Sequence, residues 1–209
     1  IPLYEVFKTQ KKWQVTAYQL KEKAEEGIYF ETSEMPAKLC FWHSILKKEQ
    51  LCFLAKEGAS RFQKVENLSV ITLQKSREPS QGVLFIARFL GPTVGVVRFI
   101  SVWIYNEQEG KFIKVPPPLY LTDQGEYKII SAIDNSEGIL ITADRIWKSG
   151  EPLYGSHQFR VKIYKYSEDT MFKLVGEYET KTKYQSLDDV DIINVIEPEL
   201  SNIQKFIEK

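Results

Sequence analysis

Residues 102–115 read Val-Trp-Ile-Tyr-Asn-Glu-Gln-Glu-Gly-Lys-Phe-Ile-Lys-Val, an aromatic segment, a charged turn and a second segment that contains phenylalanine. The same order returns at 161–175, where Val-Lys-Ile-Tyr precedes a polar turn and Met-Phe-Lys-Leu-Val. Residues 61–65, Arg-Phe-Gln-Lys-Val, resemble the phenylalanine segment alone. Short runs of aromatic and β-branched residues bounded by turn residues are typical of β-hairpins. The stretch therefore predicts an antiparallel, all-β fold built on a repeated unit.

The repeat extends upstream of both hairpins. Gly82–Ala87 matches Gly138–Ala143, which begins 56 residues later. A sheet of a few strands cannot cover both of its faces alone, so repeats of this length stack on one another. With 209 residues and a period of roughly 55, the chain has room for about four units. We expect one β-repeat domain over residues 1–209, arranged like a propeller, with a two-layer β-sandwich as the alternative.

The pattern of turn residues and apolar bursts predicts thirteen strands and little helix. Six residues at 21–26 have helix-forming composition, and 201–207 could form a last turn or two of helix. The expected strands cover 13–20, 27–31, 38–45, 50–55, 68–73, 82–89, 96–106, 111–115, 127–133, 138–143, 157–166, 171–179 and 190–196.

The order of segments over roughly residues 82–180 resembles the FG-GAP propeller repeat of integrin α chains and many exported bacterial proteins. In that family a blade often carries a calcium loop just before its inner strand. The resemblance implies calcium ligands at Asp134, Asn135, Ser136 and Glu137, directly before Gly138. Ser136 weakens the third ligand position, since calcium needs several charged oxygens. An Asx turn between two strands explains the same residues without any cofactor.

Charge argues against a nucleic-acid partner, and hydropathy argues against a transmembrane segment. Lys and Arg together number 28, as do Asp and Glu, so no net charge attracts nucleic acid to the whole molecule. The longest apolar runs are too short or too polar for a transmembrane segment.

The two cysteines, Cys40 and Cys52, lie in an expected hairpin with its turn at 47–49. That register puts Cys40 about four residues, roughly 13 Å, beyond the residue opposite Cys52. A disulfide needs Cα atoms within about 7 Å, so two buried thiols are the favoured interpretation, and a bridge would require a bulge or a different turn. The first residue is Ile1 and not Met, which indicates a processed precursor or a trimmed chain. We expect an exported protein, periplasmic or secreted.

Aromatic residues on loops are the best candidates for a binding site. Trp147, Tyr154 and His157 surround a Gly- and Pro-rich connection, and Trp42 and Trp103 lie on separate expected strands. Trp and Tyr combine a large contact area with a polar group, so the five could bind a carbohydrate, a peptide or a protein partner. The alternative is that these rings fill the core between sheets.

We therefore expect a binding or protein-interaction module without catalysis. No phosphate-binding glycine loop, nucleophile elbow or zinc-ligand spacing is found in the sequence. One alternative is a hydrolase that uses carboxylates such as Asp144 and Asp191. Another is a structural accessory domain of a larger assembly.

Overall fold

The computed structural model describes the chain in fourteen pieces. These pieces are residues 1–3, 7, 13–19, 36–43, 48–57, 60–74, 80–91, 95–115, 119–121, 125–130, 137–152, 155–167, 171–185 and 194–208. The expected helix at 21–26 and the expected strand at 27–31 lie outside them.

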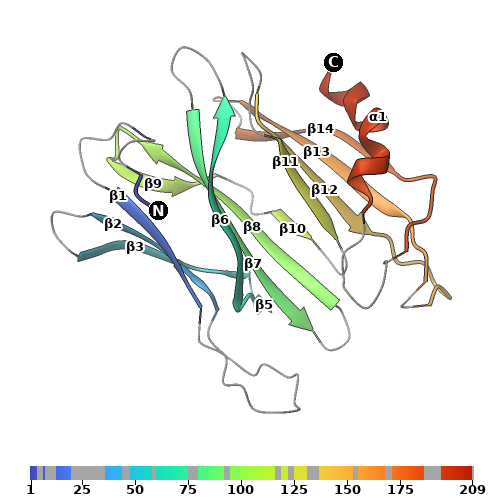
Figure 1. The fold of residues 1–209 in the computed structure, drawn as a ribbon, viewed down its shortest axis with the longest axis horizontal. Helices are drawn as coiled ribbons and strands as arrows, with labels where there is room; N and C mark the ends of the chain where they lie inside the picture. The colour runs from blue at the N-terminus through green and yellow to red at the C-terminus, as the bar shows by residue number, and fades with distance from the viewer. Residues whose placement is uncertain are drawn as a thin grey trace. The chain divides into compact units, whose positions relative to one another are not determined.

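The all-β, antiparallel fold is confirmed (Figure 1). The strands are β1 (Trp13–Tyr18), β2 (Lys38–His43), β3 (Lys48–Leu54), β4 (Lys56–Glu57), β5 (Ser60–Arg61), β6 (Lys64–Gln74), β7 (Ser80–Gly91), β8 (Gly95–Asn106), β9 (Lys111–Lys114), β10 (Leu119–Leu121), β11 (Glu126–Ile130), β12 (Ile139–Arg145), β13 (Phe159–Ser167) and β14 (Met171–Glu179). One helix, α1 (Ile196–Ile207), follows them. In the described part of the chain, no helix is long and apolar enough to cross a membrane.

Contacts within the chain gather into two compact units. The first contains Ile1–Ile71, Gln81–Pro92 and Arg98–Leu119, and the second contains Thr72–Ser80, Thr93–Val97 and Tyr120–Lys209.

The first unit has an aromatic core. The rings of Phe41 and Phe112 stack with their centroids 4.3 Å apart, and Phe53 lies 3.9 Å from Trp103. Trp13 meets Phe112 edge-on at 5.6 Å. Alternate residues of a strand face one side of the sheet, which is why Phe41 and Phe53 reach the same core from β2 and β3.

Strand β2 lies between β1 and β3, and a disulfide joins Cys40 to Cys52. The expectation of two free thiols is wrong. Cys40 pairs directly with Cys52 and their Cα atoms are 4.2 Å apart, a separation typical of a directly opposed pair. Two features shift the register from the expected one: β3 begins at Lys48, inside the expected turn, and the pairing is irregular between Phe41 and Trp42.

The second sheet in chain order runs β10-β8-β7-β6, and β9 also pairs with β8. Strands β8 and β9 form the hairpin quoted from the sequence, with Phe112 opposite Tyr105. In its turn, Asn106 Oδ1 accepts a hydrogen bond from the Glu109 backbone at 3.1 Å, and Gly110 has φ +62°. Glycine suits that last position because other residues rarely adopt positive φ.

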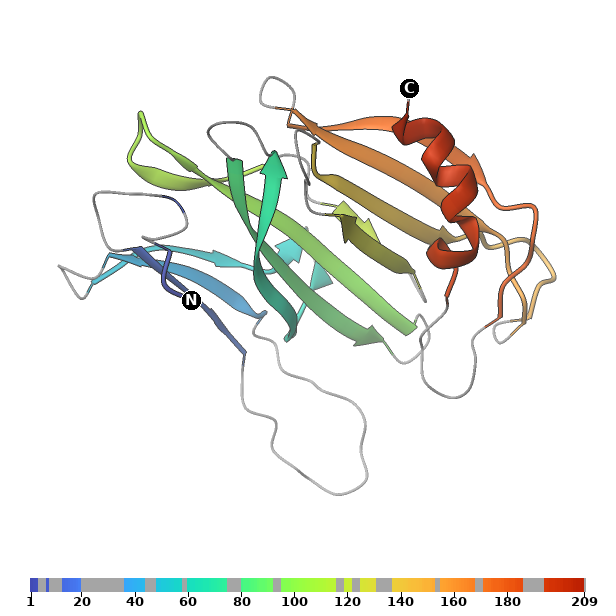
Figure 2. The ribbon, with the colours of Figure 1, turned by 45° about the horizontal axis from the view of Figure 1, so that its top comes forward.

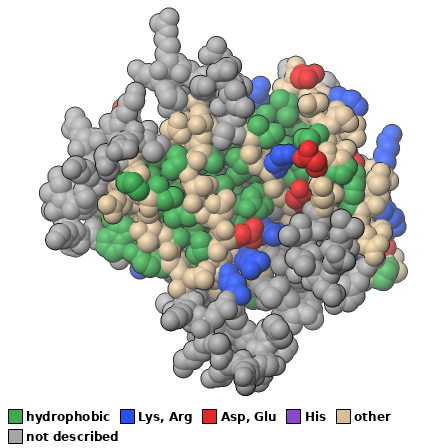
Figure 3. Space-filling view, in the orientation of Figure 1, with side chains coloured by type: hydrophobic (Ala, Val, Ile, Leu, Met, Phe, Trp, Pro, Cys, Tyr) green, Lys and Arg blue, Asp and Glu red, His purple; other side chains and the backbone are tan. Residues whose placement is uncertain are grey.

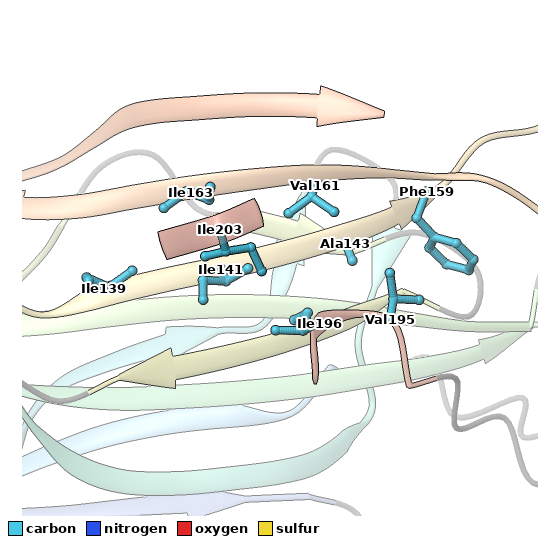
Figure 4. Packing of buried hydrophobic residues seen from close by; sticks show 9 residues of the cluster. All are labelled: Ile139, Ile141, Ala143, Phe159, Val161, Ile163, Val195, Ile196 and Ile203. Atoms are coloured by element: carbon cyan, nitrogen blue, oxygen red, sulfur yellow. The ribbon is translucent and has the colours of Figure 1, made fainter. Parts of the chain in front are cut away.

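The second unit contains a four-stranded meander, β11-β12-β13-β14, with α1 packed on one face (Figure 2). Every second residue of β12 and β13 points to the helix, as a strand period of two requires. Figure 4 shows the resulting cluster, which consists of Ile139, Ile141, Ala143, Phe159, Val161, Ile163, Val195, Ile196 and Ile203.

The predicted strand at 190–196 is wrong at its end, because Ile196 is the first residue of α1. Pro198 is tolerated in the first helical turn, where backbone N–H groups have no partner within the helix. Glu126 of β11 satisfies two such groups: its Oε2 accepts hydrogen bonds from Val195 N at 2.6 Å and Ile196 N at 2.7 Å. Burial raises the pKa of Glu126, although both backbone hydrogen bonds and Lys128 oppose that rise.

Candidate functional site

Arg145 at the end of β12 and the described residues of the connection to β13, 146–152 and 155–158, make the contacts given below, and we call them the β12–β13 corner. Ile146 N donates to Gln158 O at 2.8 Å and prolongs the strand pairing. His157 also pairs with Tyr184, which follows β14: each backbone N–H donates to the other's carbonyl, at 2.9 and 2.8 Å. The backbone at His157 is therefore held from both sides.

The imidazole of His157 is fully buried and hydrogen-bonded at both nitrogens. Nδ1 lies 3.0 Å from Glu151 Oε2, and Nε2 lies 2.9 Å from the carbonyl oxygen of Pro152. Both partners are acceptors, so the two hydrogen bonds form together only when the ring carries two N–H groups. A nitrogen that faces a carbonyl cannot take a proton from a substrate, so this arrangement holds the loop and does not suit a general base.

Glu151 connects His157 to the segment after β14. Its Oε1 accepts a hydrogen bond from Lys183 Nζ at 2.7 Å, while its Oε2 meets His157. The hydrogen bond from Lys183, with a further contribution from His157, lowers the pKa of Glu151 despite partial desolvation. Both carboxylate oxygens therefore have a partner, His157 within the corner and Lys183 after β14.

Trp147 is an exposed ring in the described part of the corner, with 46% of its surface accessible. Its centroid lies 5.2 Å from the His157 ring, and the guanidinium carbon of Arg145 lies 4.2 Å from its centroid. Arg145 and His157 are both buried, and Arg145 Nη2 also reaches the carbonyl oxygen of Gly155 at 3.5 Å. An indole held by a cation–π contact and a second ring presents its remaining surface in a fixed orientation.

Of the five candidate binding residues, the structure brings Trp147 and His157 together. Tyr154 lies outside the described residues. Trp103 is 2% exposed in the aromatic core of the first unit, and its Nε1 donates to Ser101 Oγ at 3.0 Å, so it offers no surface to a ligand. Trp42 is half-buried on β2, with its ring 6.4 Å from Tyr18.

The candidate calcium loop is described only at Glu137. The Glu137 carboxylate forms an ion pair with Lys165 at 2.8 Å. Asp134, Asn135 and Ser136 lie outside the described residues. Where side chains are described, no group of three or more His, Cys, Asp or Glu residues could hold a metal ion.

The carboxylates proposed for a hydrolase do not form a described pair. Asp191 lies outside the described residues, and Asp144 lies opposite Arg160 in the β12–β13 pairing. Arg160 also contacts Glu179 at 3.0 Å and Glu177 at 3.5 Å on β14. This ladder of alternating charge is on the sheet face away from α1, where cross-strand pairs of opposite charge stabilise a sheet.

A second polar cluster surrounds Glu199, a buried residue of α1. Its carboxylate accepts hydrogen bonds from Tyr178 Oη at 3.1 Å, Tyr184 Oη at 2.7 Å and Asn202 Nδ2 at 2.8 Å. Burial opposes ionisation of Glu199, but the hydrogen bonds from Asn202, Tyr184 and Tyr178 together lower its pKa. Burial and the same carboxylate raise the pKa of Tyr184 to about 12 and raise that of Tyr178 further. The cluster is closed and holds the helix on the sheet.

Sequence reasoning missed Arg145, Glu151 and Glu199. Glu151 and Glu199 also have partners far away in the sequence, such as Lys183, which lies 32 residues after Glu151, and Tyr178, which lies 21 residues before Glu199. The position of Glu151 in the loop shortly before His157 could have indicated their contact. Figure 3 shows acidic and basic side chains interspersed on the visible face of the described residues, in keeping with the balanced composition.

The fold and the corner define an all-β protein with an exposed, buttressed tryptophan. No family model matches the chain, and no curated protein is similar to it. Among solved structures, a chain titled "Crystal structure of CarG" is similar, with 13% identity and a TM-score of 0.41 over 61% of this chain and 95% of that one. A likeness at this level assigns neither fold nor function.

Proposed function

We propose that this protein is a non-catalytic binding module whose contact point is the β12–β13 corner. The observation that carries the proposal is Trp147, a large ring that stays half-exposed while Arg145 and His157, both buried, hold it in place. An exposed aromatic ring costs free energy in water, and rigid Trp side chains are frequent energetic centres of recognition.

The absence of catalysis is part of the proposal and rests on how the reactive groups are used. His157 has acceptors at both nitrogens, and both oxygens of Glu151 are hydrogen-bonded. Asp144 lies in a charge ladder on the other sheet face, opposite Arg160. A general acid or base needs a free position toward a substrate, which these contacts take up.

Export is a further part of the proposal. The Cys40–Cys52 disulfide is compatible with an oxidising compartment, where such bonds persist. A binding module in the periplasm or outside the cell would meet carbohydrate and protein surfaces directly.

The repeat is supported by strand order. Strands β6 to β9 and β11 to β14 each pair in sequence, and each set ends in a hairpin whose second strand contains the repeated phenylalanine, Phe112 or Phe172. We propose that the two sets descend from one unit, as the FG-GAP resemblance implies. Helix α1 covers a face that a neighbouring blade would cover in a propeller, which favours a layered arrangement for the second unit.

The test compares the protein with Trp147→Ala on immobilised panels of saccharides and extended peptides. Leu54→Ala is the control, because Leu54 is similarly exposed at 41% in the first unit. We expect at least one panel member to bind the protein and the control, and to bind Trp147→Ala about tenfold or more weakly. A ligand whose affinity is unchanged in Trp147→Ala would remove the corner as the contact point.

A further inference from the structure

We infer that the β12–β13 corner is a pH-dependent switch, closed when His157 carries a proton on each ring nitrogen and open when one of these protons is lost. This inference rests on the proposed function and adds the regulation of the same site. The two hydrogen bonds of the buried His157 ring and its contact with Trp147 carry it.

The imidazole of His157 meets an acceptor at each nitrogen. Glu151 Oε2 lies 3.0 Å from Nδ1, and the carbonyl oxygen of Pro152 lies 2.9 Å from Nε2. A neutral imidazole has one N–H group, and its other nitrogen carries a lone pair. Because His157 is fully buried, a lone pair that faces an acceptor there leaves both atoms unsatisfied at a cost in free energy. The closed arrangement therefore needs the imidazolium.

The carbonyl oxygen of Pro152 is the acceptor that loses its donor when the ring becomes neutral. Nδ1 faces a carboxylate, a stronger acceptor than a carbonyl, so the remaining proton stays between His157 and Glu151. The proton on Nε2 passes to water, and the lone pair that it leaves is directed at Pro152 O. That oxygen also accepts the Gly155 N–H at 3.1 Å. Deprotonation thus releases Pro152 and Gly155 together from the His157 ring.

The charged groups nearest to the ring keep their charge near neutral pH. The hydrogen bond from Lys183 lowers the pKa of Glu151 below its ordinary 4.5, partial desolvation opposes this, and the contact with His157 adds to it. The cations of the surroundings are Arg145 on β12 and Lys183 after β14, and side chains of these two types lose their proton only in alkaline solution.

Two further titratable groups come from the segment after β14 and from α1. Tyr184, whose backbone pairs with that of His157, donates its hydroxyl to Glu199 of α1 at 2.7 Å. Burial and this carboxylate raise the pKa of Tyr184 to about 12. Burial opposes ionisation of Glu199, but its hydrogen bonds lower its pKa. Neither group changes charge near neutral pH, where histidine is the residue type that ordinarily does.

The proton on His157 also acts on Trp147. Ile146 N donates to Gln158 O at 2.8 Å and continues the β12–β13 pairing, which brings the rings of Trp147 and His157 to a centroid distance of 5.2 Å. A cation within about 6 Å of an indole centroid is attracted to the ring. In the closed state Trp147 has two such cations, the imidazolium and the Arg145 guanidinium at 4.2 Å. Deprotonation removes one of them, so the ring is held less firmly.

The direction of the pH dependence follows from proton binding. The closed corner binds one proton more than the open corner, so it is favoured as pH falls and lost as pH rises. Protonation of a buried histidine that repositions a recognition residue is a local charge change with an effect on binding.

Nitrogen NMR of the histidine side chains tests the first step, from about pH 5 to about pH 8, where histidine ordinarily changes charge. The chain has two histidines, so loss of a signal in His157→Gln or His43→Gln assigns each ring. We expect protons on both nitrogens of His157 at the acid end and on Nδ1 alone at the other end. A ring that keeps one protonation state throughout, or that is neutral with its proton on Nε2, would overturn the inference.

The emission of Trp147, isolated by subtracting the spectrum of Trp147→Phe, tests the second step. We expect a shift to the red as pH rises. His157→Gln should remove the pH dependence, because glutamine does not titrate, and the matched control His43→Gln should keep it. Glu151→Gln should move the change to lower pH, since the imidazolium loses its carboxylate. An emission that is independent of pH, or that still depends on pH in His157→Gln, would overturn the switch.

The switch and the binding module can fail separately. The titrations use no ligand, so they decide the switch even if no saccharide or peptide of the panels binds. For a panel ligand that depends on Trp147, we expect affinity to fall about fivefold or more as pH rises over this range, and to stay constant in His157→Gln. A ligand that binds through Trp147 equally at both pH values would leave the binding module in place and overturn its regulation.

Discussion

The backbone of Gly176 on β14 lies directly against the ring of Phe206 near the end of α1. A Cβ added at Gly176 would stand 2.5 Å from Phe206 Cδ1, closer than carbon atoms can approach. Tyr178, two residues further on, stacks on the same ring with its centroid at 5.7 Å and the planes 3° apart. Phe206 thus packs α1 against β14 at the one residue of the contact, Gly176, that has no side chain.

We predict that Gly176→Ala destabilises the protein by about 1–3 kcal/mol, because the added methyl group must displace Phe206 or the helix. Urea unfolding measures the change in the free energy of unfolding. The double variant with Phe206→Ala should recover part of the loss, since the ring that meets the methyl group is then absent. Additive losses in the two single variants would show that the contact is not the cause.

We predict that acid destabilises the protein partly through Glu199. Its pKa is lowered below the ordinary 4.5, so the stability it adds is complete above that value and is lost as pH falls through the lowered one. Glu199→Gln should cost about 1–2 kcal/mol at pH 7 and flatten the decline between pH 5 and pH 3. Glu197→Gln, a change of an exposed acid in the same turn, is the control, since its ion pair with Lys128 is solvated. A decline in Glu199→Gln as steep as in the unmodified protein would exclude this origin.

We predict that reducing the Cys40–Cys52 bond lowers the free energy of unfolding by about 3 kcal/mol, because the bond closes a loop of 12 residues in the unfolded chain. Thermal unfolding with and without dithiothreitol measures the difference. A variant with serine at both positions should unfold like the reduced protein and be insensitive to the reductant. Sensitivity to reductant in that variant would mean that the agent acts elsewhere.

We predict that His157→Phe destabilises the β12–β13 corner by about 2 kcal/mol, since Pro152 O and one oxygen of Glu151 lose their donor. Emission of Trp147, obtained as the difference between the protein and Trp147→Phe, should shift to the red as the ring gains water. Lys183→Met, which removes the other donor to Glu151, should change the emission less, because it leaves the His157 ring in place. An unshifted emission in His157→Phe would contradict the buttressing role of His157.

Most of the strands could be predicted from the periodicity of apolar residues and from the turn residues between them. Alternation along 171–179 corresponds to β14 residue for residue, and the repeated hairpin at 102–115 is β8 with β9. The end of α1 was expected at 201–207, but its start was not. The N–H groups of Val195 and Ile196 are accepted by Glu126, about 70 residues earlier, and the apolar residues at 190–196 were interpreted as a strand.

The candidate site also contains residues that local sequence identified and residues that it did not. Trp147 and His157 were identified because aromatic residues cluster on a Gly- and Pro-rich loop, a local property. The expected strand ended at residue 143, so Arg145, the last residue of β12, was not considered, although it lies two residues before Trp147 and its guanidinium contacts that ring. The disulfide was missed for a related reason: the start of β3 at Lys48 and one irregularity beside Phe41 move the register until Cys40 faces Cys52.

The order of elements in the second unit has a consequence for biosynthesis. Strands β11 to β14 are complete before Val195, Ile196 and Ile203 have been translated, and these three residues cover the apolar row of Ile139, Ile141 and Val161. A nascent chain that pauses between residues 180 and 195 would display that row to the cell while the sheet is already able to pair. Such exposed apolar faces are where chaperones bind and where aggregation begins.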